Sequence, residues 1–194
     1  MEASKKKLAL SLVIMGVILV IIDQVIKILV KTNMDLGESI RVIGNWFQLL
    51  YIENEGMAFG MAFGGKVGKF LLSFFRIILV GALIWWMRNL MRRDTKVPTG
   101  VFVGLTLITA GAIGNIVDCL FYGIIWDYAP LMFGRVVDMF YFPLIDTVLP
   151  SWLPIWGGER FTFFDPVFNF ADSCVCVGAF YLILFQFRFF SKEE

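Results

Sequence analysis

The chain has 194 residues, of which 59% are hydrophobic and 17% charged, and its formal net charge is +1. This composition is too apolar for a soluble domain of this size and indicates a protein that crosses a membrane several times. The near-zero net charge gives no reason to expect a nucleic-acid partner. Because the sequence contains no histidine, it excludes Ser-His and Cys-His nucleophile systems, His-ligated haem and HExxH zinc hydrolases.

Three cysteines remain as possible metal ligands or disulfide partners. Cys174 and Cys176 are two positions apart on a predicted helix and therefore face different ways, and Cys119 belongs to another predicted helix. An odd number of cysteines without metal-ligand spacing is typical of small apolar filler. We therefore expect no disulfide, no metal site and no cofactor.

Four apolar stretches are each near the roughly 20 residues that a helix needs to cross the hydrocarbon of a bilayer. They cover about 8–30, 67–90, 98–122 and 167–190. Lysines and arginines gather before the first, between the second and third, and after the fourth, so these segments are predicted to be cytoplasmic. Both termini are then inside, and the loops 31–66 and 123–166 are outside. The sequence predicts an all-α polytopic membrane protein with four transmembrane helices, in a single membrane domain over 1–194.

The outer loops are predicted to hold structure of their own. Ser39–Ile43 and Trp46–Ile52 are rich in β-branched and aromatic residues and are separated by Gly44-Asn45, a pattern that predicts a small extracytoplasmic β-hairpin. The longer second loop carries Trp152 and Trp156 among many Phe and Pro residues. We expect this long outer loop to lie at the outer membrane–water interface, where amphipathic aromatic residues concentrate.

Polar residues collect near the predicted outer ends of the spans. They are Asp23 and Lys27 in the first span, Asn115 and Asp118 in the third, Asn169 and Asp172 in the fourth, and Asn54 and Glu55 in the loop before the second. A carboxylate in hydrocarbon costs roughly 2.5–3.5 kcal/mol on insertion scales, so such acids mark functional sites by default. Asn115 precedes Asp118 by three residues, as Asn169 precedes Asp172, which puts each amide on the helix face of its acid. These residues alone predict acid–base chemistry by Asp118 and Asp172 within the membrane.

Structural roles are alternatives for several of these residues. Asp23 and Lys27 stand in the acid-before-base i,i+4 order of a helix-stabilising pair. Asp118 and Asp172 can also cap helices, where the dipole favours negative charge, or pair with Lys27 or Arg135.

Other polar residues have a simpler interpretation. Asp138, taken alone, is interpreted as a solvated acid of the outer loop. Arg76 is expected to extend its side chain towards lipid phosphate. Gly111 and Gly114 have the spacing of small residues that permits close approach of two helices.

Five short motifs together resemble the motif blocks of the lipoprotein signal peptidase (signal peptidase II) family. In chain order they are Asp23-Gln24-x-x-Lys27, Asn54-x-Gly56-x-Ala58-Phe59, Gly114-Asn115-x-x-Asp118, Gly134-x-Val136-Val137-Asp138 and Phe168-Asn169-x-Ala171-Asp172. They occur in the order of that family and cover about the whole chain. The resemblance implies an aspartic endopeptidase of the bacterial inner membrane. Its substrate would be a diacylglyceryl-modified prolipoprotein, cut just before the lipidated cysteine to remove the signal peptide.

The resemblance also implies roles for single residues. The family's catalytic aspartates lie in the Gly-x-Val-x-Asp and Asn-x-Ala-Asp blocks and correspond to Asp138 and Asp172. Asp138 therefore replaces Asp118 in the expected pair. The substrate-binding or supporting residues implied are Asp23, Lys27, Asn54, Gly56, Asn115, Asp118 and Asn169. We expect a monomer with its active site at the outer leaflet, and with membrane lipids and the substrate as its partners.

The chain departs from the family pattern in two places. The family commonly has arginine directly after the aspartate of the Asn-x-x-Asp block, where this chain has Cys119. Arg135 and Arg160 are candidates for a replacement guanidinium, and the sequence alone does not decide between them. The intervals between the motif aspartates are also longer than usual, through extra residues in 123–166.

A second function class is a small proton-coupled transporter or channel component that uses intramembrane carboxylates as a relay. The sequence has no inverted repeat and no matching pair of interrupted spans, which that class would favour. A structural membrane subunit would leave the convergent polar residues unexplained.

Overall fold

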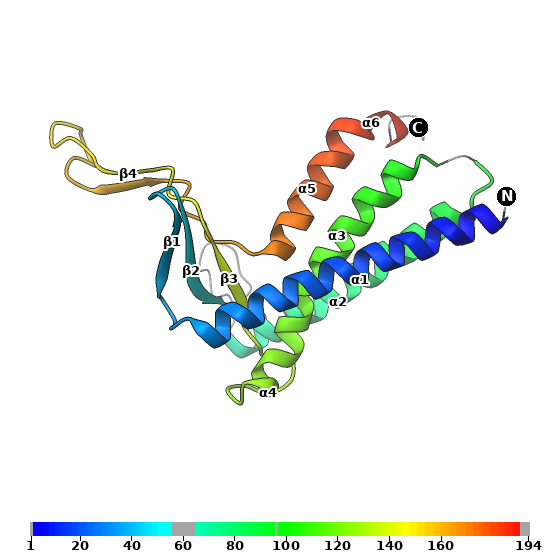
Figure 1. Cartoon of the computed structure of the whole chain (residues 1–194), viewed down its shortest axis with the longest axis horizontal. Helices are drawn as coiled ribbons and strands as arrows, with labels where there is room; N and C mark the ends of the chain where they lie inside the picture. Colours follow the sequence, from blue (N-terminus) through cyan, green and yellow to red (C-terminus); the bar gives the residue numbers. More distant parts are fainter. Residues whose placement is uncertain (1, 56–64, 96, 191–194) are drawn as a thin grey trace. The chain divides into compact units, whose positions relative to one another are not determined.

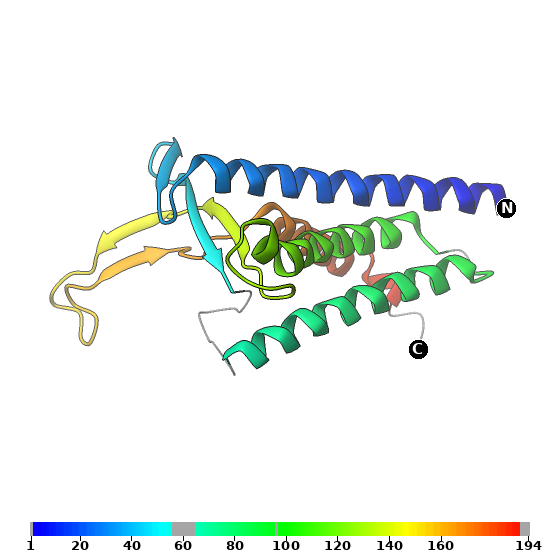
Figure 2. The same ribbon diagram turned by 90° about the horizontal axis from the view of Figure 1, so that it is seen from below.

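The computed structural model describes residues 2–55, 65–95 and 97–190 (Figures 1 and 2). Two compact units divide the chain. The first is formed by Met1–Ile26, Asn54–Val136 and Phe170–Glu194, and the second by Lys27–Glu53 and Val137–Asn169. The first unit is helical, and the second contains most of the β-structure.

The apolar stretches of the sequence form long helices. They are α1 (Glu2–Asn33), which begins in the first unit and ends in the second, α2 (Gly65–Arg92), α3 (Thr99–Val117) and α5 (Phe170–Phe185). A π-helical turn, Asp118–Tyr122, continues α3 into the short α4 (Gly123–Ile125), and α6 (Phe187–Phe190) follows α5.

Three helical stretches of the described chain are long and apolar enough to cross a membrane: Ala3–Asn33, Val67–Arg92 and Thr99–Ile125. They confirm the first three predicted spans. The fourth predicted span, 167–190, is divided into α5, with 16 residues, and α6. At 1.5 Å per residue α5 is about 24 Å long, less than the hydrocarbon thickness of about 30 Å. The count of four spans therefore stays a prediction.

The helix α3 lies at the centre of the first unit. Of the residues in its most apolar stretch 50% are buried, against 11% in α1 and in α2. Its Phe102 and Leu105 pack with Leu12 of α1, Leu90 of α2 and Leu182 of α5 in one core cluster. The outward faces of α1 and α2 remain apolar and exposed, as expected of helices that face lipid.

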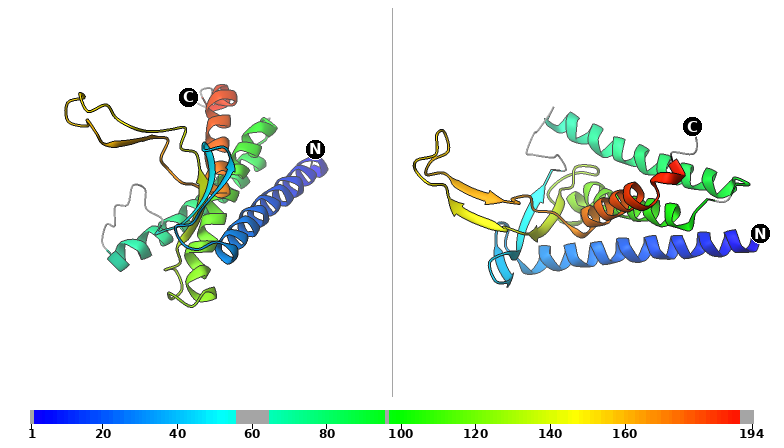
Figure 3. Two further views of the ribbon diagram at one scale, coloured as in Figure 1. Left: turned by 60° about the vertical axis from the view of Figure 1, so that its left-hand side comes forward. Right: turned by 90° about the horizontal axis from the view of Figure 1, so that it is seen from above.

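Small residues bring α5 close to α3, and the two helices lie side by side in Figures 1 and 3. A Cβ atom at Gly104 would lie 2.5 Å from Cδ2 of Leu182, and one at Gly178 would lie 2.8 Å from the carbonyl oxygen of Gly104. Near the start of α5, a Cβ atom at Gly111 would collide with the carbonyl oxygen of Ala171. The predicted role of Gly111 in close helix approach is therefore confirmed.

The second unit is built on antiparallel strands. Within the described chain, β1 (Ser39–Ile43), β2 (Phe47–Asn54) and β3 (Val136–Tyr141) form one sheet in the order β1-β2-β3. The β1–β2 hairpin was predicted from the sequence, and its turn contains Gly44 with φ +52°, a conformation that glycine adopts without strain.

The loop 123–166 contains strands that were not predicted. Besides β3, it holds β4 (Ile145–Val148) and β5 (Arg160–Phe163), which pair in a separate antiparallel sheet. Phe140 of β3 forms an isolated bridge with Phe168, whose backbone N–H and C=O both bond to those of Phe140 at 3.1 and 2.7 Å. This bridge fixes the chain two residues before α5 begins.

Candidate functional site

Asp172 lies in the first turn of α5 and is held by a neighbouring helix. Asn115 of α3 donates a hydrogen bond from Nδ2 to Oδ1 of Asp172 at 2.8 Å. The absence of a side chain at Gly111, one turn before Asn115, allows the two backbones to approach closely enough for this bond. The sequence placed both residues at one membrane depth, and the structure brings them together.

Asp23 of α1 anchors the same end of α5. Its side chain is 1% exposed, and its Oδ1 accepts a hydrogen bond from the backbone N–H of Ala171 at 2.9 Å. This N–H is one of the donors that a helix N-terminus leaves without an intrahelical partner. A carboxylate there also interacts favourably with the positive end of the helix dipole. Asp23 therefore fixes the backbone directly beside Asp172.

Gln24 connects Asp23 with Asp118. Its Nε2 lies 2.8 Å from Oδ1 of Asp118, 3.1 Å from Oδ2 of Asp23 and 3.2 Å from the carbonyl oxygen of Gly114. The hydroxyl of Tyr122 donates to Oε1 of Gln24 at 3.2 Å. Asp118 is fully buried at the start of the π-helical turn. These bonds join α1 to the C-terminal end of α3.

Gln24 belongs to one of the family motifs, but its contacts were not predicted. The feature that could have indicated them is an amide beside an acid in an otherwise apolar helix. A Cβ atom at Gly114 would lie 2.6 Å from Oδ2 of Asp23, so the predicted role of Gly114 in close helix approach is also confirmed. Gly114 lies close to a side chain of α1 as well as to α5.

Asp138 belongs to the second unit and is buried in β3. Its side chain is 2% exposed, and its neighbours Val137 and Met139 are both 0% exposed. Asn169, also 0% exposed, donates a hydrogen bond from Nδ2 to Oδ1 of Asp138 at 2.6 Å. The interpretation of Asp138 as a solvated loop acid was therefore wrong, because Asp138 lies in the buried part of the strand β3.

The other expected residues have different surroundings. Lys27 is 0% exposed on α1, and Asn54 is half-buried at the end of β2. Gly56 lies outside the described residues. Among the described residues, no group of three or more His, Cys, Asp or Glu side chains could hold a metal ion.

The guanidinium beside Cys119 comes from Arg76 of α2. Nη1 of Arg76 donates to Sγ of Cys119 at 3.1 Å, and the cysteine is 3% exposed. The expectation that Arg76 extends to lipid phosphate is corrected by this contact. The reason is that Arg76 shares a helix face with the buried Ser73, which donates to the carbonyl oxygen of Met132 at 3.1 Å. This face of α2 is turned into the first unit.

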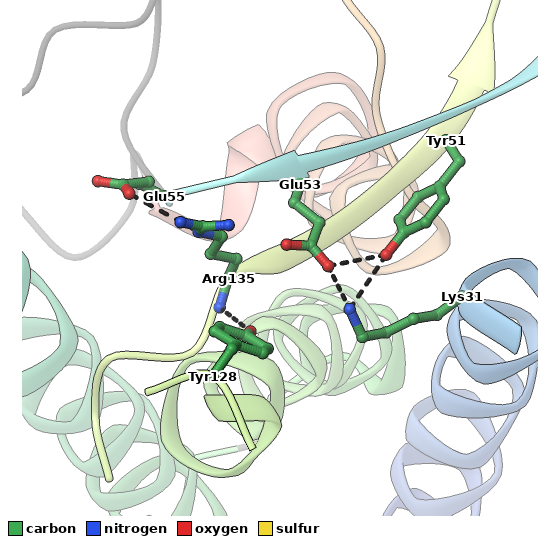
Figure 4. Close-up of polar contacts among 6 residues, drawn as sticks. All are labelled: Lys31, Tyr51, Glu53, Glu55, Tyr128 and Arg135. Atoms are coloured by element: carbon green, nitrogen blue, oxygen red, sulfur yellow. Dashed lines mark hydrogen bonds and ion pairs between the residues drawn. The ribbon is translucent and has the colours of Figure 1, made fainter. Parts of the chain in front are cut away.

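The two arginines that were expected near Cys119 have other partners. Arg135 pairs with Glu55 at 3.7 Å and lies 5.5 Å from the ring centroid of Tyr128 (Figure 4). Arg160 donates to both oxygens of Asp146 at 2.8 and 2.5 Å. The hydrogen bonds from Arg160 lower the pKa of Asp146 below its usual value. The guanidinium that contacts Cys119 is therefore that of Arg76 and not that of either candidate.

A charged cluster in the second unit holds β2 against the last turns of α1. Lys31 donates to the hydroxyl of Tyr51 at 3.1 Å and to the carboxylate of Glu53, while the Tyr51 hydroxyl donates to Glu53 at 2.7 Å (Figure 4). The side chains of Lys31 and Glu53 are 10% and 9% exposed. This cluster positions the hairpin that precedes Asn54.

Long apolar helices occur together with buried carboxylates that accept hydrogen bonds from amide side chains. These features define a multi-pass membrane protein with ionisable groups inside its helical unit. The family model described as signal peptidase (SPase) II matches residues 15–188. The chain therefore belongs to the signal peptidase II family and is a membrane protease.

Relatives and a solved structure agree with this assignment. The chain is 49% identical over 184 residues to a lipoprotein signal peptidase of Porphyromonas gingivalis, which covers 87% of this chain and 79% of that protein. It is 40% identical over 173 residues to that of Amoebophilus asiaticus, covering 85% and 72% of the two chains. A solved structure described as a bacterial membrane enzyme matches with a TM-score of 0.65 and 26% identity, over 95% of this chain and 92% of that one. The comparisons give no support to a transporter or channel component.

Proposed function

We propose that this chain is an aspartic endopeptidase that removes the signal peptide from diacylglyceryl-modified prolipoproteins by cleaving just before the lipidated cysteine. Membership in the signal peptidase II family supports the processing of prolipoproteins. The observation that supports the aspartic mechanism is that each of the two motif acids accepts a hydrogen bond from a motif asparagine. Asn169 donates to Asp138 at 2.6 Å, and Asn115 donates to Asp172 at 2.8 Å.

In the proposed mechanism Asp138 and Asp172 act as one pair. The pair is proposed to share one proton, as paired carboxylates in one catalytic site do. The ionised member takes a proton from water, which attacks the scissile carbonyl carbon. The protonated member hydrogen-bonds to the carbonyl oxygen, and the roles then exchange as the amine leaves.

Supporting roles follow from the contacts of each acid within its own unit. Asp23, Asn115 and Asn169 orient the two acids directly or through the start of α5. Asp118 is tied to α1 through Gln24. We assign Lys27, Asn54 and Gly56 to substrate binding or support, on the family motifs.

We place the protein in the bacterial inner membrane with both termini in the cytoplasm and the active site at the outer leaflet. The lysines and arginines next to the spans support this orientation by the positive-inside rule. A diacylglyceryl group contributes about 0.8 kcal/mol of membrane partitioning per buried methylene. Two acyl chains would therefore hold the scissile bond at a fixed depth, which supplies much of the positioning that catalysis needs.

Purified protein incubated with a diacylglyceryl-modified prolipoprotein, scored by gel shift, tests this function. Asp138→Asn and Asp172→Asn should each abolish cleavage, because the amide has nearly the same shape but cannot exchange a proton. Asp146→Asn is the matched control, since this exposed acid pairs with Arg160, and it should cleave normally. Substantial turnover by either of the first two variants would refute the aspartic pair.

A further inference from the structure

An apolar cavity of about 630 Å³ lies between α1, α2 and α3 in the first unit. Leu12, Gly16 and Val20 of α1 line one side, and Ile84 and Met87 of α2 line another. This volume is in the range of about 300–1,000 Å³ that is usual for ligand sites.

The hydroxyl groups in this cavity do not make it polar. Thr106 and Thr109 of α3 line it, and their hydroxyls donate to the carbonyl oxygens of Phe102 and Leu105 at 2.8 and 2.7 Å. Backbone acceptors therefore take these donors. The cavity offers its occupant mainly hydrocarbon surface, which favours a hydrocarbon ligand over a polar one.

A smaller cavity of about 330 Å³ adjoins the first at the N-terminal end of α1, and Met91 lines both. Its lining includes Lys5 and Arg93, with one acid, Asp94. Nζ of Lys5 donates to the carbonyl oxygen of Arg93 at 2.9 Å, which places the two cationic residues side by side. Arg88 lines the apolar cavity and adds a third cation to the wall of the two cavities.

The apolar cavity also has the length of one acyl chain. Its lining on α1 runs from Ala9 to Ile21, about 18 Å at 1.5 Å per residue. One leaflet contributes about half of a hydrocarbon core of about 30 Å. An apolar cavity one leaflet long that adjoins a cationic polar cavity matches a ligand with a hydrocarbon tail and an anionic head.

We propose that the first unit binds an anionic phospholipid, with one acyl chain in the apolar cavity and the phosphate group between Lys5 and Arg93. Basic pockets between transmembrane helices on the cytoplasmic side are known to bind anionic headgroups. With the orientation proposed above, the lipid comes from the cytoplasmic leaflet. It is therefore distinct from the substrate, whose acyl chains enter from the outer leaflet.

The first test compares lipids on the purified wild-type protein by native mass spectrometry and thermal shift. Phosphatidylglycerol should bind more tightly than phosphatidylcholine with the same acyl chains, because its headgroup carries a net negative charge. Lys5→Gln and Arg93→Gln should each weaken phosphatidylglycerol binding about fivefold, as expected for one lost cation near the phosphate. Lys7→Gln is the matched control on an exposed part of α1 and should leave binding unchanged.

The second test fills the apolar cavity. A Cβ atom at Gly16 would meet Cγ2 of Thr106 at 3.5 Å, an ordinary contact, so Gly16→Leu should fold and occupy the space of the acyl chain. Gly81→Leu is the control, because a Cβ atom there meets nothing within 4 Å. Gly16→Leu should lose phosphatidylglycerol binding while Gly81→Leu retains it.

Equal affinity for the two lipids, or equal binding by Gly16→Leu and Gly81→Leu, would overturn the proposal. Displacement of bound phosphatidylglycerol by a diacylglyceryl-modified peptide would also overturn it, by assigning the cavity to the substrate. These readouts measure lipid binding without turnover. They therefore fail or succeed independently of the Asp138→Asn and Asp172→Asn activity test.

Discussion

The carboxylate of Asp23 accepts a hydrogen bond from the backbone N–H of Ala171, which is 148 residues further along the chain. This bond joins α1 to the first turn of α5, one residue before Asp172. The i,i+4 pair of Asp23 with Lys27 stays a prediction. The contact with Ala171 makes Asp23 a positioning residue for a proposed catalytic acid.

Asp23→Ala should lower both stability and activity. The variant leaves the buried N–H of Ala171 without its acceptor, at a cost of about 1–3 kcal/mol. Asp23→Asn keeps an oxygen acceptor and should lose less. Thermal unfolding and cleavage rates of the two variants check this, with Asp35→Ala at an exposed position as the control. Equal losses in the alanine and asparagine variants would contradict the role of this hydrogen bond.

Gln24→Leu should uncouple α1 from the C-terminal end of α3. It removes the donor to Asp118 and the acceptor for the Tyr122 hydroxyl, so we expect a loss of about 1–3 kcal/mol in the free energy of unfolding. Gln24→Glu should be at least as damaging, because it adds a third carboxylate beside Asp23 and Asp118. A double-mutant cycle with Tyr122→Phe should show non-additive losses. Strict additivity would mean that the contact with Tyr122 contributes nothing.

Arg76 and Cys119 should be energetically coupled. Arg76→Met removes the guanidinium donor at 3.1 Å from Sγ, and a hydrogen bond to a charged group contributes about 1.5–3 kcal/mol. In a Cys119→Ala background the same substitution should cost less, since the acceptor is already absent. Unfolding free energies of the two single variants and the double variant measure the coupling. Arg41→Met, at an exposed position of β1, should have little effect.

The asparagines that hold the two acids should affect the rate without reaching zero. Asn115→Ala and Asn169→Ala each remove one donor to a carboxylate, so the acid remains but is less well oriented. Asp118→Asn should likewise retain some turnover. Cleavage rates with a diacylglyceryl-modified prolipoprotein separate these roles. If Asp118→Asn were inactive while Asp138→Asn cleaved normally, Asp118 and Asp172 would be the pair.

The stability of the protein should fall at alkaline pH partly through Tyr141. Burial, and then the hydrogen bond that its hydroxyl donates to Asp165 at 3.1 Å, raise the pKa of Tyr141 above its ordinary value of 10.0. The folded state therefore favours the protonated phenol, and this contribution is present below pH 10.0 and lost as the pH rises through the folded pKa. Unfolding temperatures of wild type and Tyr141→Phe between neutral and alkaline pH measure it. The wild type should lose more stability over this range than the variant, and parallel curves would contradict the assignment.

Local composition determined the long helices and the hairpin. Three membrane-spanning stretches were predicted close to their observed bounds, because an unbroken apolar run of this length has few other stable conformations. The β1–β2 hairpin was predicted because Gly44-Asn45 suits a tight turn between β-branched runs. The motif residues near the ends of the spans also followed from the sequence, since intramembrane acids and amides are costly without a role.

Contacts between distant segments were decided only by the tertiary structure. Val136–Tyr141 has the β-branched and aromatic residues of a strand, but the partners that bury it, such as Phe168 in its bridge with Phe140, are distant in the sequence. The contact of Arg76 with Cys119 was not predicted, because the burial of one face of α2 depends on how the helix packs. An apolar run specifies a helix through interactions between residues that are close in the sequence. Hydrogen-bond partners that are far apart in the chain depend on how the helices are rotated and how closely their backbones approach, which a single sequence does not specify.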